Sequence, residues 1–315
     1  MRWFGALILG SAAVACAGLA TASECSNPHA LGVSRTLQVN PSAERLIGTQ
    51  QYRNTLPLKH REVVLTFDDG PLPRYSGAIL DILASECVQA TYFLVGDMAR
   101  QFPQMVRKIA VAGHTIGTHT QSHPFAIDRM PFDRARRQID DGITSVSEAL
   151  GDSGEVAPFV RIPGLARTNA IEKYLASRKL SVFSTDVTGD DWRRIRAREV
   201  VKRTMRRLEA KGRGIILLHD IHAVTVMALP SLLRELKAHG YHVVHLTTQP
   251  QPATTPPAIV PMPPERPKPS EPDADAQVAV INPFVIAASE MPSAASSLPL
   301  VITVADQMVA FIDTD

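Results

Sequence analysis

The chain has 315 residues, 45% of them hydrophobic, and a formal net charge of +2 at pH 7. This length accommodates one domain of roughly 200 residues with a filled core, together with extensions at its ends. So small a net charge gives no electrostatic basis for nucleic-acid binding, and we expect no nucleic-acid partner.

The N-terminal residues are typical of an export signal. Arg2 precedes the apolar run Phe4–Leu19, and small residues follow up to Ala22. This order is typical of a secretory signal peptide, so we predict that residues 1–22 are removed. The alternatives are a lipoprotein at Cys16 or a retained anchor, although the apolar run is short for a full membrane span. We predict a periplasmic or extracellular protein with no stable membrane span after cleavage.

Residues 23–55 are polar and are predicted to form an irregular N-terminal extension. Cys25 lies in this extension, and Cys87 lies in the region that follows. In an oxidising compartment these two cysteines either form a disulfide or remain separate thiols, and the sequence leaves both possibilities open.

Strand-like and helix-like segments alternate from residue 56 to 247, which marks this range as the main domain. Helical spacing of apolar residues appears in Asp133–Leu150 and Ser231–His239, and Arg196–Lys211 is predicted to be a helix with a basic outer face. The alternation predicts an α/β fold with parallel strands, either closed into a barrel or left as an open sheet. The seven strand candidates are Val63–Phe67, Ala90–Val95, Thr115–His119, Phe159–Pro163, Leu180–Asp186, Gly214–His219 and Tyr241–Leu246.

The chain changes character after Thr248. Ten prolines lie between Pro250 and Pro272, so residues 248–277 are predicted to form an extended linker without a core. Residues 278–315 are apolar without a regular pattern, and the sequence assigns them no role.

Polar side chains follow the predicted strands, where chemistry collects in a parallel α/β fold. Asp68 and Asp69 follow the first strand, His119 ends the third, and His123 lies four residues later. Asp69 and the two histidines form a His₂Asp set that can hold a divalent ion and leave a position for water. Zn²⁺ suits these ligands best, with Co²⁺ or another first-row metal as the alternative. An isolated pair of histidines at this spacing is usually a surface pair, but the neighbouring carboxylates favour a metal site.

Asp68 is the predicted general base. A carboxylate beside a metal ion can accept a proton from water, because the ion lowers the pKa of that water toward ~7. The alternative is that Asp68 caps the turn at Gly70. Arg161 lies near the end of the fourth strand and needs a carboxylate partner if it is buried. We predict that this partner is Asp68, with an ordinary surface ion pair as the alternative.

His219 ends the apolar sixth strand and is the predicted general acid, because imidazole titrates in the range that a leaving amine requires. The alternatives are a fourth metal ligand and a core histidine. Asp186, at the end of the fifth strand, is predicted to orient His219 and to raise its pKa, with Asp190 and Asp191 as competitors. Trp192 either walls the site and stacks on a sugar or belongs to the core.

Taken together, these residues resemble the polysaccharide deacetylases with the NodB homology domain, carbohydrate esterase family four, over residues 56–247. The resemblance is based on three motifs: Thr-Phe-Asp-Asp-Gly at Thr66–Gly70, His-Thr-Gln-Ser-His at His119–His123 and Leu-Leu-His at Leu217–His219. The resemblance implies a distorted (β/α)₇ barrel, one zinc-like ion and removal of acetyl groups from N-acetylated sugars. It implies the same base, arginine partner and acid as above, and it assigns Leu217 to the acetyl pocket.

Two motifs depart from the family pattern. An arginine-x-proline-aromatic motif stands here as Arg161–Gly164, so glycine replaces the aromatic residue. The resemblance implies that the N–H at this position helps to hold the oxyanion, and Gly164 retains that N–H. An Asp-x-x-Asp-Trp motif is stretched to Asp186–Trp192, which assigns Asp191 and Trp192 to a substrate-binding loop.

The sequence therefore predicts a metal-dependent hydrolase that releases acetate. Its predicted partner is a chitin-like or peptidoglycan-like glycan, from which it removes the N-acetyl groups of N-acetylglucosamine. An O-acetyl xylan esterase or another metal amidase on the same fold is the alternative enzyme. A glycan-binding protein without turnover is the alternative of another class.

Overall fold

The computed structural model describes Cys25 and residues 27–248. The predicted signal peptide at 1–22 and the tail at 278–315 lie outside the described residues, as does the predicted linker except for Thr248. Within the described range, every helix is too short or too polar to cross a lipid bilayer.

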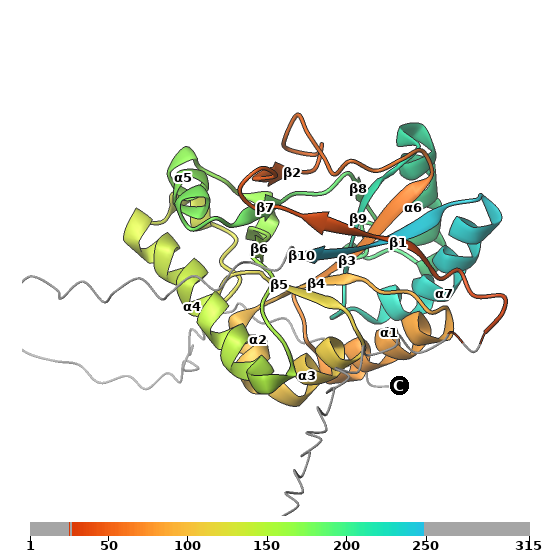
Figure 1. Cartoon of the computed structure of the whole chain (residues 1–315), viewed down its shortest axis with the longest axis horizontal. Coiled ribbons are helices and arrows are strands. Elements are labelled where there is room, and N and C mark those ends of the chain that lie inside the picture. Colours follow the sequence, from red (N-terminus) through yellow and green to blue (C-terminus); the bar gives the residue numbers. More distant parts are fainter. Residues whose placement is uncertain (1–24, 26, 249–315) are drawn as a thin grey trace, which may run out of the picture. The chain divides into compact units, whose positions relative to one another are not determined.

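A ring of parallel strands, β3 to β9, forms the centre of the domain (Figure 1). β3 pairs with β4 and β9, the ladder continues from β4 through β5 and β6 to β7, and β9 pairs with β8. No ladder joins β7 to β8 within residues 27–248, so the ring is interrupted there. The predicted α/β barrel is confirmed. The bounds are β3 Glu62–Asp68, β4 Thr91–Leu94, β5 Thr115–Thr118, β6 Phe159–Val160, β7 Ser181–Phe183, β8 Val187–Thr188 and β9 Gly214–His219.

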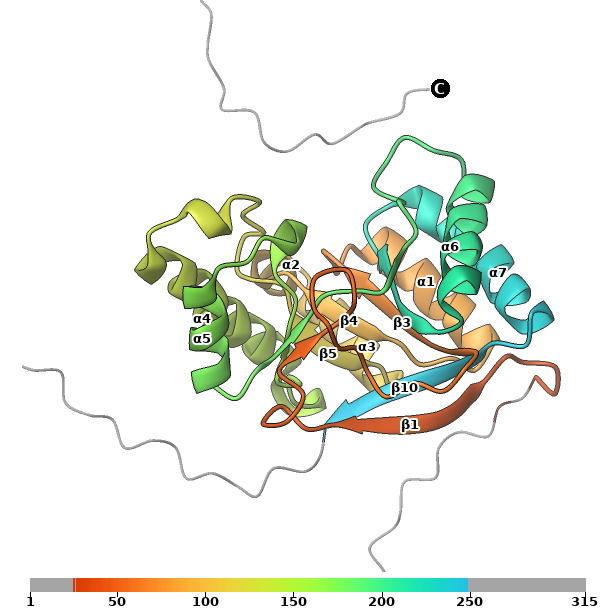
Figure 2. The same cartoon turned by 90° about the horizontal axis from the view of Figure 1, so that it is seen from above.

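Three further strands flank this ring. β1 (Val33–Val39) pairs with β10 (His242–Thr248), β10 pairs with the start of β3, and β2 (Leu46–Ile47) pairs with β7. Figure 2 shows β1 and β10 side by side along one edge. The segment at 241–246, predicted as a barrel strand, therefore lies outside the ring. The expectation that residues 23–55 are irregular was wrong, because they contain β1 and β2.

Phenylalanine side chains fill the interior of the ring. Phe183 packs against Phe159 and Phe93, with ring centroids 4.9 and 5.4 Å apart. Leu246 of β10 belongs to the same buried cluster, so β10 covers one end of the interior. Tyr92 precedes Phe93 on β4 and packs instead with the helices, as the alternation of a strand requires. Each buried phenylalanine contributes about 1.5–3 kcal/mol to the free energy of folding, because its side chain is removed from water.

The helices lie outside the strands (Figures 1 and 2). Their bounds are α1 Pro73–Ser85, α2 Gly96–Gln101, α3 Pro103–Val111, α4 Phe132–Leu150, α5 Asn169–Ser177, α6 Ala197–Lys211 and α7 Ala223–Ala238. α4 and α6 match the predicted helices, whereas α7 begins eight residues before the predicted segment Ser231–His239. On α4 the predicted inward residues Ile139, Val146 and Leu150 are buried, and Ile143 is partly buried. These contacts dock α4 on the barrel beside α5.

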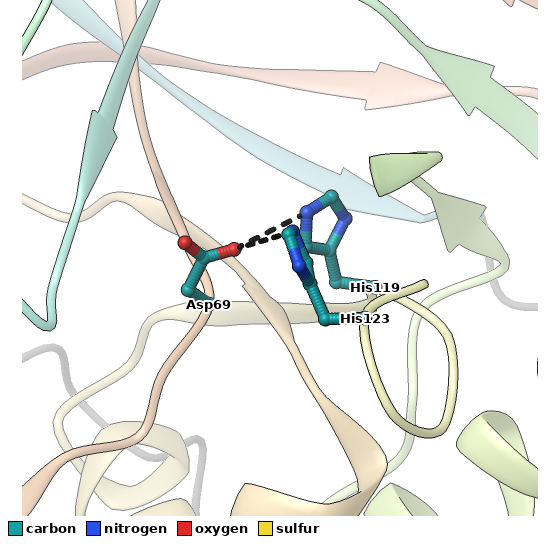
Figure 3. Close-up of side chains that lie close together, drawn as sticks. All are labelled: Asp69, His119 and His123. Atoms are coloured by element: carbon teal, nitrogen blue, oxygen red, sulfur yellow. Dashed lines mark ion pairs between the residues drawn. The ribbon is translucent and has the colours of Figure 1, made fainter. Parts of the chain in front are cut away.

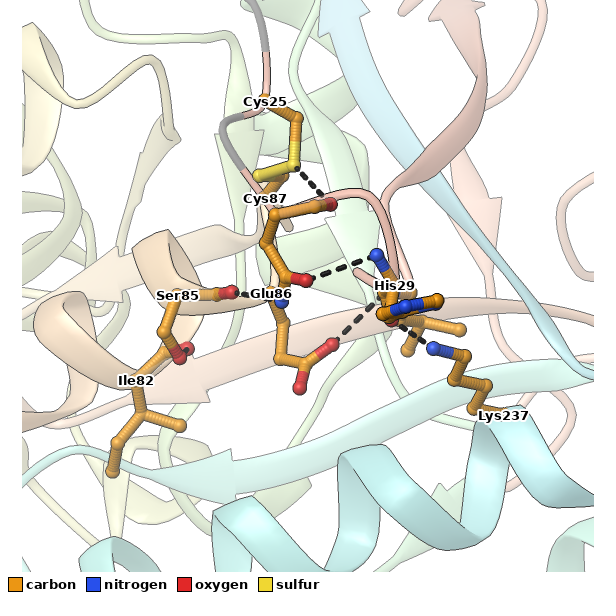
Figure 4. The surroundings of a disulfide bond; sticks show 9 residues. Cys25, His29, Ile82, Ser85, Glu86, Cys87 and Lys237 are labelled. Carbon is orange, nitrogen blue, oxygen red and sulfur yellow. Dashed lines mark hydrogen bonds between the residues drawn. A yellow bond between two sulfur atoms is a disulfide. The ribbon is translucent and has the colours of Figure 1, made fainter.

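A disulfide joins Cys25 to Cys87 (Figure 4), which decides between the two states that the sequence left open. Beside it, Asn27 Nδ2 donates a hydrogen bond to the carbonyl of Ser85 at 3.0 Å. Both contacts fasten the segment before β1 to the turn that follows α1.

The register of the parallel strands brings the predicted site residues to one edge of the ring. Asp68 on β3 and His219 on β9 are register partners. The ladder between β5 and β6 ends immediately before His119 and Arg161. Since parallel strands end together, four predicted residues from separate parts of the chain reach the same edge.

Candidate active site

Asp69, His119 and His123 converge at this edge (Figure 3). Asp69 Oδ1 lies 3.4 Å from His119 Nε2 and 3.1 Å from His123 Nε2. One nitrogen or oxygen atom from each residue lies within 4.8 Å of the others, which is close enough for all three to coordinate one ion. The structure therefore brings the predicted ligand set together, and its occupation by a metal remains a prediction.

The chemistry of these atoms fits a cation. His119 Nδ1 donates a hydrogen bond to the carbonyl of Arg161 at 2.7 Å, so in the neutral ring Nε2 carries a lone pair. That lone pair faces Asp69 Oδ1, which is buried and has no hydrogen-bond partner among the described residues. Burial alone would raise the pKa of the Asp69 carboxyl. Protons on His119 and His123 would hold that pKa well below its usual range, and a shared cation meets the same need when both rings are neutral. An ionised carboxylate that faces a nitrogen lone pair is satisfied by a shared metal ion.

The backbone at this cluster is strained and firmly held. Asp69 has φ 76° and His123 has φ 52°, both in the left-handed region that disfavours residues with a Cβ. The loop between the histidines is tied to α4, because Gln121 N–H donates to the Gln138 carbonyl at 2.7 Å. Such strain persists only where surrounding contacts enforce it, and it concentrates at functional sites.

Arg161 holds Asp68 as predicted. Its Nη1 donates to Asp68 Oδ1 at 2.6 Å, and its two terminal nitrogens also donate to Thr66 Oγ1 and the Ser184 carbonyl, each at 2.9 Å. The alternative of a surface ion pair is wrong, because Arg161 is fully buried. Burial lowers the pKa of the guanidinium, and Asp68 opposes that shift. The pair aims Asp68 Oδ2 toward the metal-ligand cluster, 3.7 Å from His119 Nε2.

The turn after these two aspartates is capped by Asp220, whereas the sequence left Asp68 as a candidate for this cap. Gly70 N–H donates to Asp220 Oδ1 at 3.0 Å, and Ser76 Oγ donates to Asp220 Oδ2 at 2.5 Å. Burial raises the pKa of Asp220 to about 7. This cap leaves Asp68 to pair with Arg161.

His219 is oriented by Asp191, and the prediction that Asp186 does this was wrong. His219 Nδ1 donates to Asp191 Oδ1 at 2.8 Å, and His219 N–H donates to Asp191 Oδ2 at 2.7 Å. Thr225 Oγ1 donates to the same carboxylate at 2.6 Å. Burial by itself would lower the pKa of His219, but Asp191, with help from more distant carboxylates, raises it to about 9. His219 is thus a cation at neutral pH.

Asp186 has a structural place instead. Its carboxylate accepts hydrogen bonds from Thr49 N–H and Oγ1 at 2.8 and 2.7 Å, from Thr55 Oγ1 at 2.7 Å and from Ile215 N–H at 2.9 Å. These donors connect the loop after β2 to the start of β9. The Asp186 side chain therefore lies at the start of β9, whereas His219 lies at the end of this strand.

Trp192 lies at the surface beside His219, so the core alternative for this residue was wrong. It is 44% exposed, and its ring stands edge-on to His219 with 5.4 Å between centroids. Asp190 anchors the same loop on α6, because Arg203 Nη1 and Arg207 Nη1 donate to its carboxylate at 2.9 and 2.8 Å. This anchor places the following Asp191 and Trp192 at the site.

Comparison with known proteins gives the family. A family model described as polysaccharide deacetylase matches residues 56–183. A chitooligosaccharide deacetylase of Rhizobium leguminosarum is 31% identical over 166 residues, which cover 51% of this chain and 72% of that protein. The chain belongs to the polysaccharide deacetylase family.

Other relatives are named as peptidoglycan deacetylases. A peptidoglycan-N-acetylglucosamine deacetylase of Listeria monocytogenes is 29% identical over 186 residues, or 59% of this chain. The matched part is only 38% of that relative's length. The solved peptidoglycan deacetylase of Bdellovibrio bacteriovorus has a TM-score of 0.61 and 31% identity, covering 69% of this chain and 59% of the other.

Two further predicted site residues, Gly164 and Leu217, have the following positions in the structure. Gly164 lies in a short 3₁₀ turn, Pro163–Leu165, with φ 59°, a conformation that glycine adopts without strain. Leu217 on β9 is 6% exposed and precedes His219 on the same strand by two residues. Their predicted roles in holding the oxyanion and lining an acetyl pocket remain predictions.

The sequence did not indicate Phe125, which the structure places against the cluster. Its ring stands edge-on to His123 with 4.6 Å between centroids, although the side chain is 73% exposed. The available signal was its position two residues after His123, beyond Pro124. No periodicity reveals a loop residue of this kind, because its neighbours are set by tertiary structure.

Proposed function

We propose that this protein is a metal-dependent hydrolase that removes N-acetyl groups from a polymer or oligomer of N-acetylglucosamine, chitin-like or peptidoglycan-like, with release of acetate. The observation that carries the proposal is the unpaired, buried Asp69 Oδ1 facing the Nε2 atoms of His119 and His123. The named activities of the Rhizobium and Listeria relatives support the substrate class.

Asp69, His119 and His123 would hold the ion, and their one oxygen and two nitrogens suit Zn²⁺, with Co²⁺ as an alternative. When bound, a divalent ion supplies Lewis acidity, polarising the acetamide carbonyl and lowering the pKa of the attacking water. The three protein ligands of such a set leave coordination positions for water and substrate.

The two hydrogen-bonded pairs beside the cluster supply the proton transfers. Asp68, held by Arg161, accepts the proton of the attacking water through Oδ2, which points at the cluster. As water adds to the carbonyl carbon, the Gly164 N–H is the proposed donor to the developing oxyanion. His219, protonated and held by Asp191 through Nδ1, gives the proton on Nε2 to the departing nitrogen as the C–N bond breaks.

We also place this activity outside the cytoplasm. The apolar run Phe4–Leu19 behind Arg2 supports export. The Cys25–Cys87 disulfide supports an oxidising compartment, where such bonds persist. Peptidoglycan and other envelope glycans are accessible to an enzyme in that location.

Replacement of Asp68 by asparagine tests the proposal. The Asp68→Asn variant should keep its zinc and lose about 10³-fold in kcat, because the amide cannot accept the proton. Zinc content is measured by mass spectrometry of the metal, and turnover by acetate release from N-acetylchitopentaose and from peptidoglycan. His119→Ala, as the comparison, should lose the zinc itself.

Near-normal acetate release by Asp68→Asn would contradict the base assignment. Acetate release by the wild type from acetylated xylan, without release from either amide substrate, would favour the esterase alternative. Glycan binding without acetate release at any metal concentration would favour a binding protein, and related family members do include a described pseudoenzyme.

A further inference from the structure

Two exposed aromatic side chains, Phe125 and Trp192, lie at the candidate site. Among the described residues, the phenylalanine and tryptophan side chains that are largely exposed to solvent are Phe125, Phe132 and Trp192. Phe125 contacts His123 and Trp192 contacts His219, whereas Phe132 packs on Tyr174 of α5. Large apolar rings left in water beside a polar site indicate a surface that receives a partner.

Phe125 is the more exposed of the two rings at the site, at 73%. It belongs to the loop after β5 that also carries His123, so its position is tied to a predicted metal ligand. The loop is tied to α4 by the hydrogen bond from Gln121 N–H to the Gln138 carbonyl, and the Phe125 ring packs edge-on against His123. The contact with His123 therefore places the exposed ring beside the predicted metal-ligand cluster.

The absence of a side chain at Gly164 leaves space next to this ring. A Cβ added to Gly164 would lie 3.7 Å from Phe125 Cδ1, and apart from the two neighbours of Gly164 in the chain no other described side chain comes within 4 Å of it. Phe125 thus borders an uncovered stretch of backbone that includes the proposed oxyanion donor. A flat ligand group could lie on the ring and still reach the cluster.

We propose that Phe125 is the platform on which the pyranose ring of the acetylated sugar stacks, and that it sets the preference of this enzyme for glycans. This proposal rests on the proposed function. One face of an equatorially substituted pyranose presents C–H groups, which are apolar and carry partial positive charge. The negative face of an aromatic ring attracts these hydrogens, and stacking removes both surfaces from water. Trp192 contacts His219, the proposed general acid, and offers a second aromatic ring to the substrate.

The proposal makes Phe125 a residue for glycan affinity rather than for metal binding. The alternative is that the ring only supports His123, in which case its removal disturbs the ion. An equilibrium binding experiment without turnover distinguishes stacking on the glycan from support of His123. Zinc-loaded full-length Asp68→Asn protein serves as the parent, and N-acetylchitopentaose is the probe, with Kd measured by calorimetry.

Adding Phe125→Ala to this parent should weaken N-acetylchitopentaose binding about tenfold, the size expected of one lost aromatic contact. Zinc content should stay at one ion per chain. Phe125→Trp should restore the affinity to within about threefold, because another flat ring can stack. Phe132→Ala, which removes an exposed ring that packs on Tyr174 of α5, is the matched control and should bind like the parent.

Unchanged affinity in Phe125→Ala, or no detectable binding by the parent, would overturn the stacking role. Loss of zinc together with affinity would overturn it as well and assign the ring to His123. Acetate release by the wild type is scored separately and decides the proposed function. A failure of either proposal is therefore recognised independently of the other.

Discussion

At the scale of single residues, the pair of His219 and Asp191 defines the acid side of the site. Burial disfavours a charged imidazole, yet Asp191 reverses this effect and brings the pKa of His219 to about 9. Because this value lies above the ordinary 6.5, the favourable interaction of His219⁺ with Asp191 contributes fully to stability below pH 6.5. It is lost as the pH rises through 9.

We predict that Asp191→Asn lowers the pKa of His219 and reduces kcat at pH 8 about 10²-fold, because the uncharged amide no longer stabilises the imidazolium. In the wild type, kcat should fall on the alkaline side as His219 loses its proton. In the variant this alkaline limb should move to lower pH. The measurement is acetate release from N-acetylchitopentaose across pH 6–10 at saturating substrate.

Asp186→Asn is the matched control, since Asp186 was the other candidate partner and lies near Ile215 at the start of β9. Its alkaline limb should stay where the wild type has it. A limb that moves in Asp186→Asn and not in Asp191→Asn would contradict the assignment.

At the scale of elements, the shorter strands depend on side-chain anchors as well as ladders. β2, β6 and β8 have two residues each, so their backbone hydrogen bonds alone hold them weakly. Asp186, between β7 and β8, binds the loop after β2 through Thr49 and Thr55 and the start of β9 through Ile215. One carboxylate thus joins three elements.

We predict that Asp186→Ala lowers the free energy of unfolding by roughly 3 kcal/mol, because several buried donors lose their charged acceptor. Urea unfolding followed by circular dichroism measures the change. Asp133→Ala on α4 removes a carboxylate that is 77% exposed, and should change stability by less than about 0.5 kcal/mol. Equal stability of both variants and the wild type would show that the anchor is dispensable.

The sequence predicted the elements that carry a strong periodic pattern. The buried strands β3 and β9 and the amphipathic helix α4 were predicted near their observed bounds. Burial on both faces of a strand requires a continuous apolar run, and burial of one helix face requires apolar residues at helical spacing. β8 was missed, because two residues carry no period. β1 was missed because its residues alternate between partial burial and exposure, with polar side chains among them.

The candidate site divides in the same way. Asp68, Asp69, His119 and His123 lie in two short motifs at strand ends, so sequence spacing located them. The predicted partner of His219 was wrong. Three aspartates lie within six residues, and the loop backbone decides which of them reaches His219. Asp190 has φ 59° and is anchored by arginines of α6, which turns the next carboxylate toward His219. Local sequence does not encode that turn.

At the scale of the whole domain, the N-terminal segment is bound at both of its ends. β1 pairs with β10 over much of its length, and Val39 lies in the interior cluster with Leu246. The Cys25–Cys87 disulfide fixes the beginning of this segment to the turn after α1 (Figure 4). The barrel is therefore covered at one end by residues from the two extremes of the described chain.

We predict that the Cys25→Ser/Cys87→Ser double variant loses about 4 kcal/mol of unfolding free energy, because the bridge closes a loop spanning 62 residues of sequence separation and restricts the unfolded chain. The site residues lie on β3, β5, β6 and β9 and their loops, so kcat at 25 °C should stay unchanged. Urea unfolding with and without a thiol reductant measures the effect. Reductant should destabilise the wild type to the level of the variant and leave the variant as it is; equal midpoints for oxidised wild type and variant would contradict a stabilising bridge.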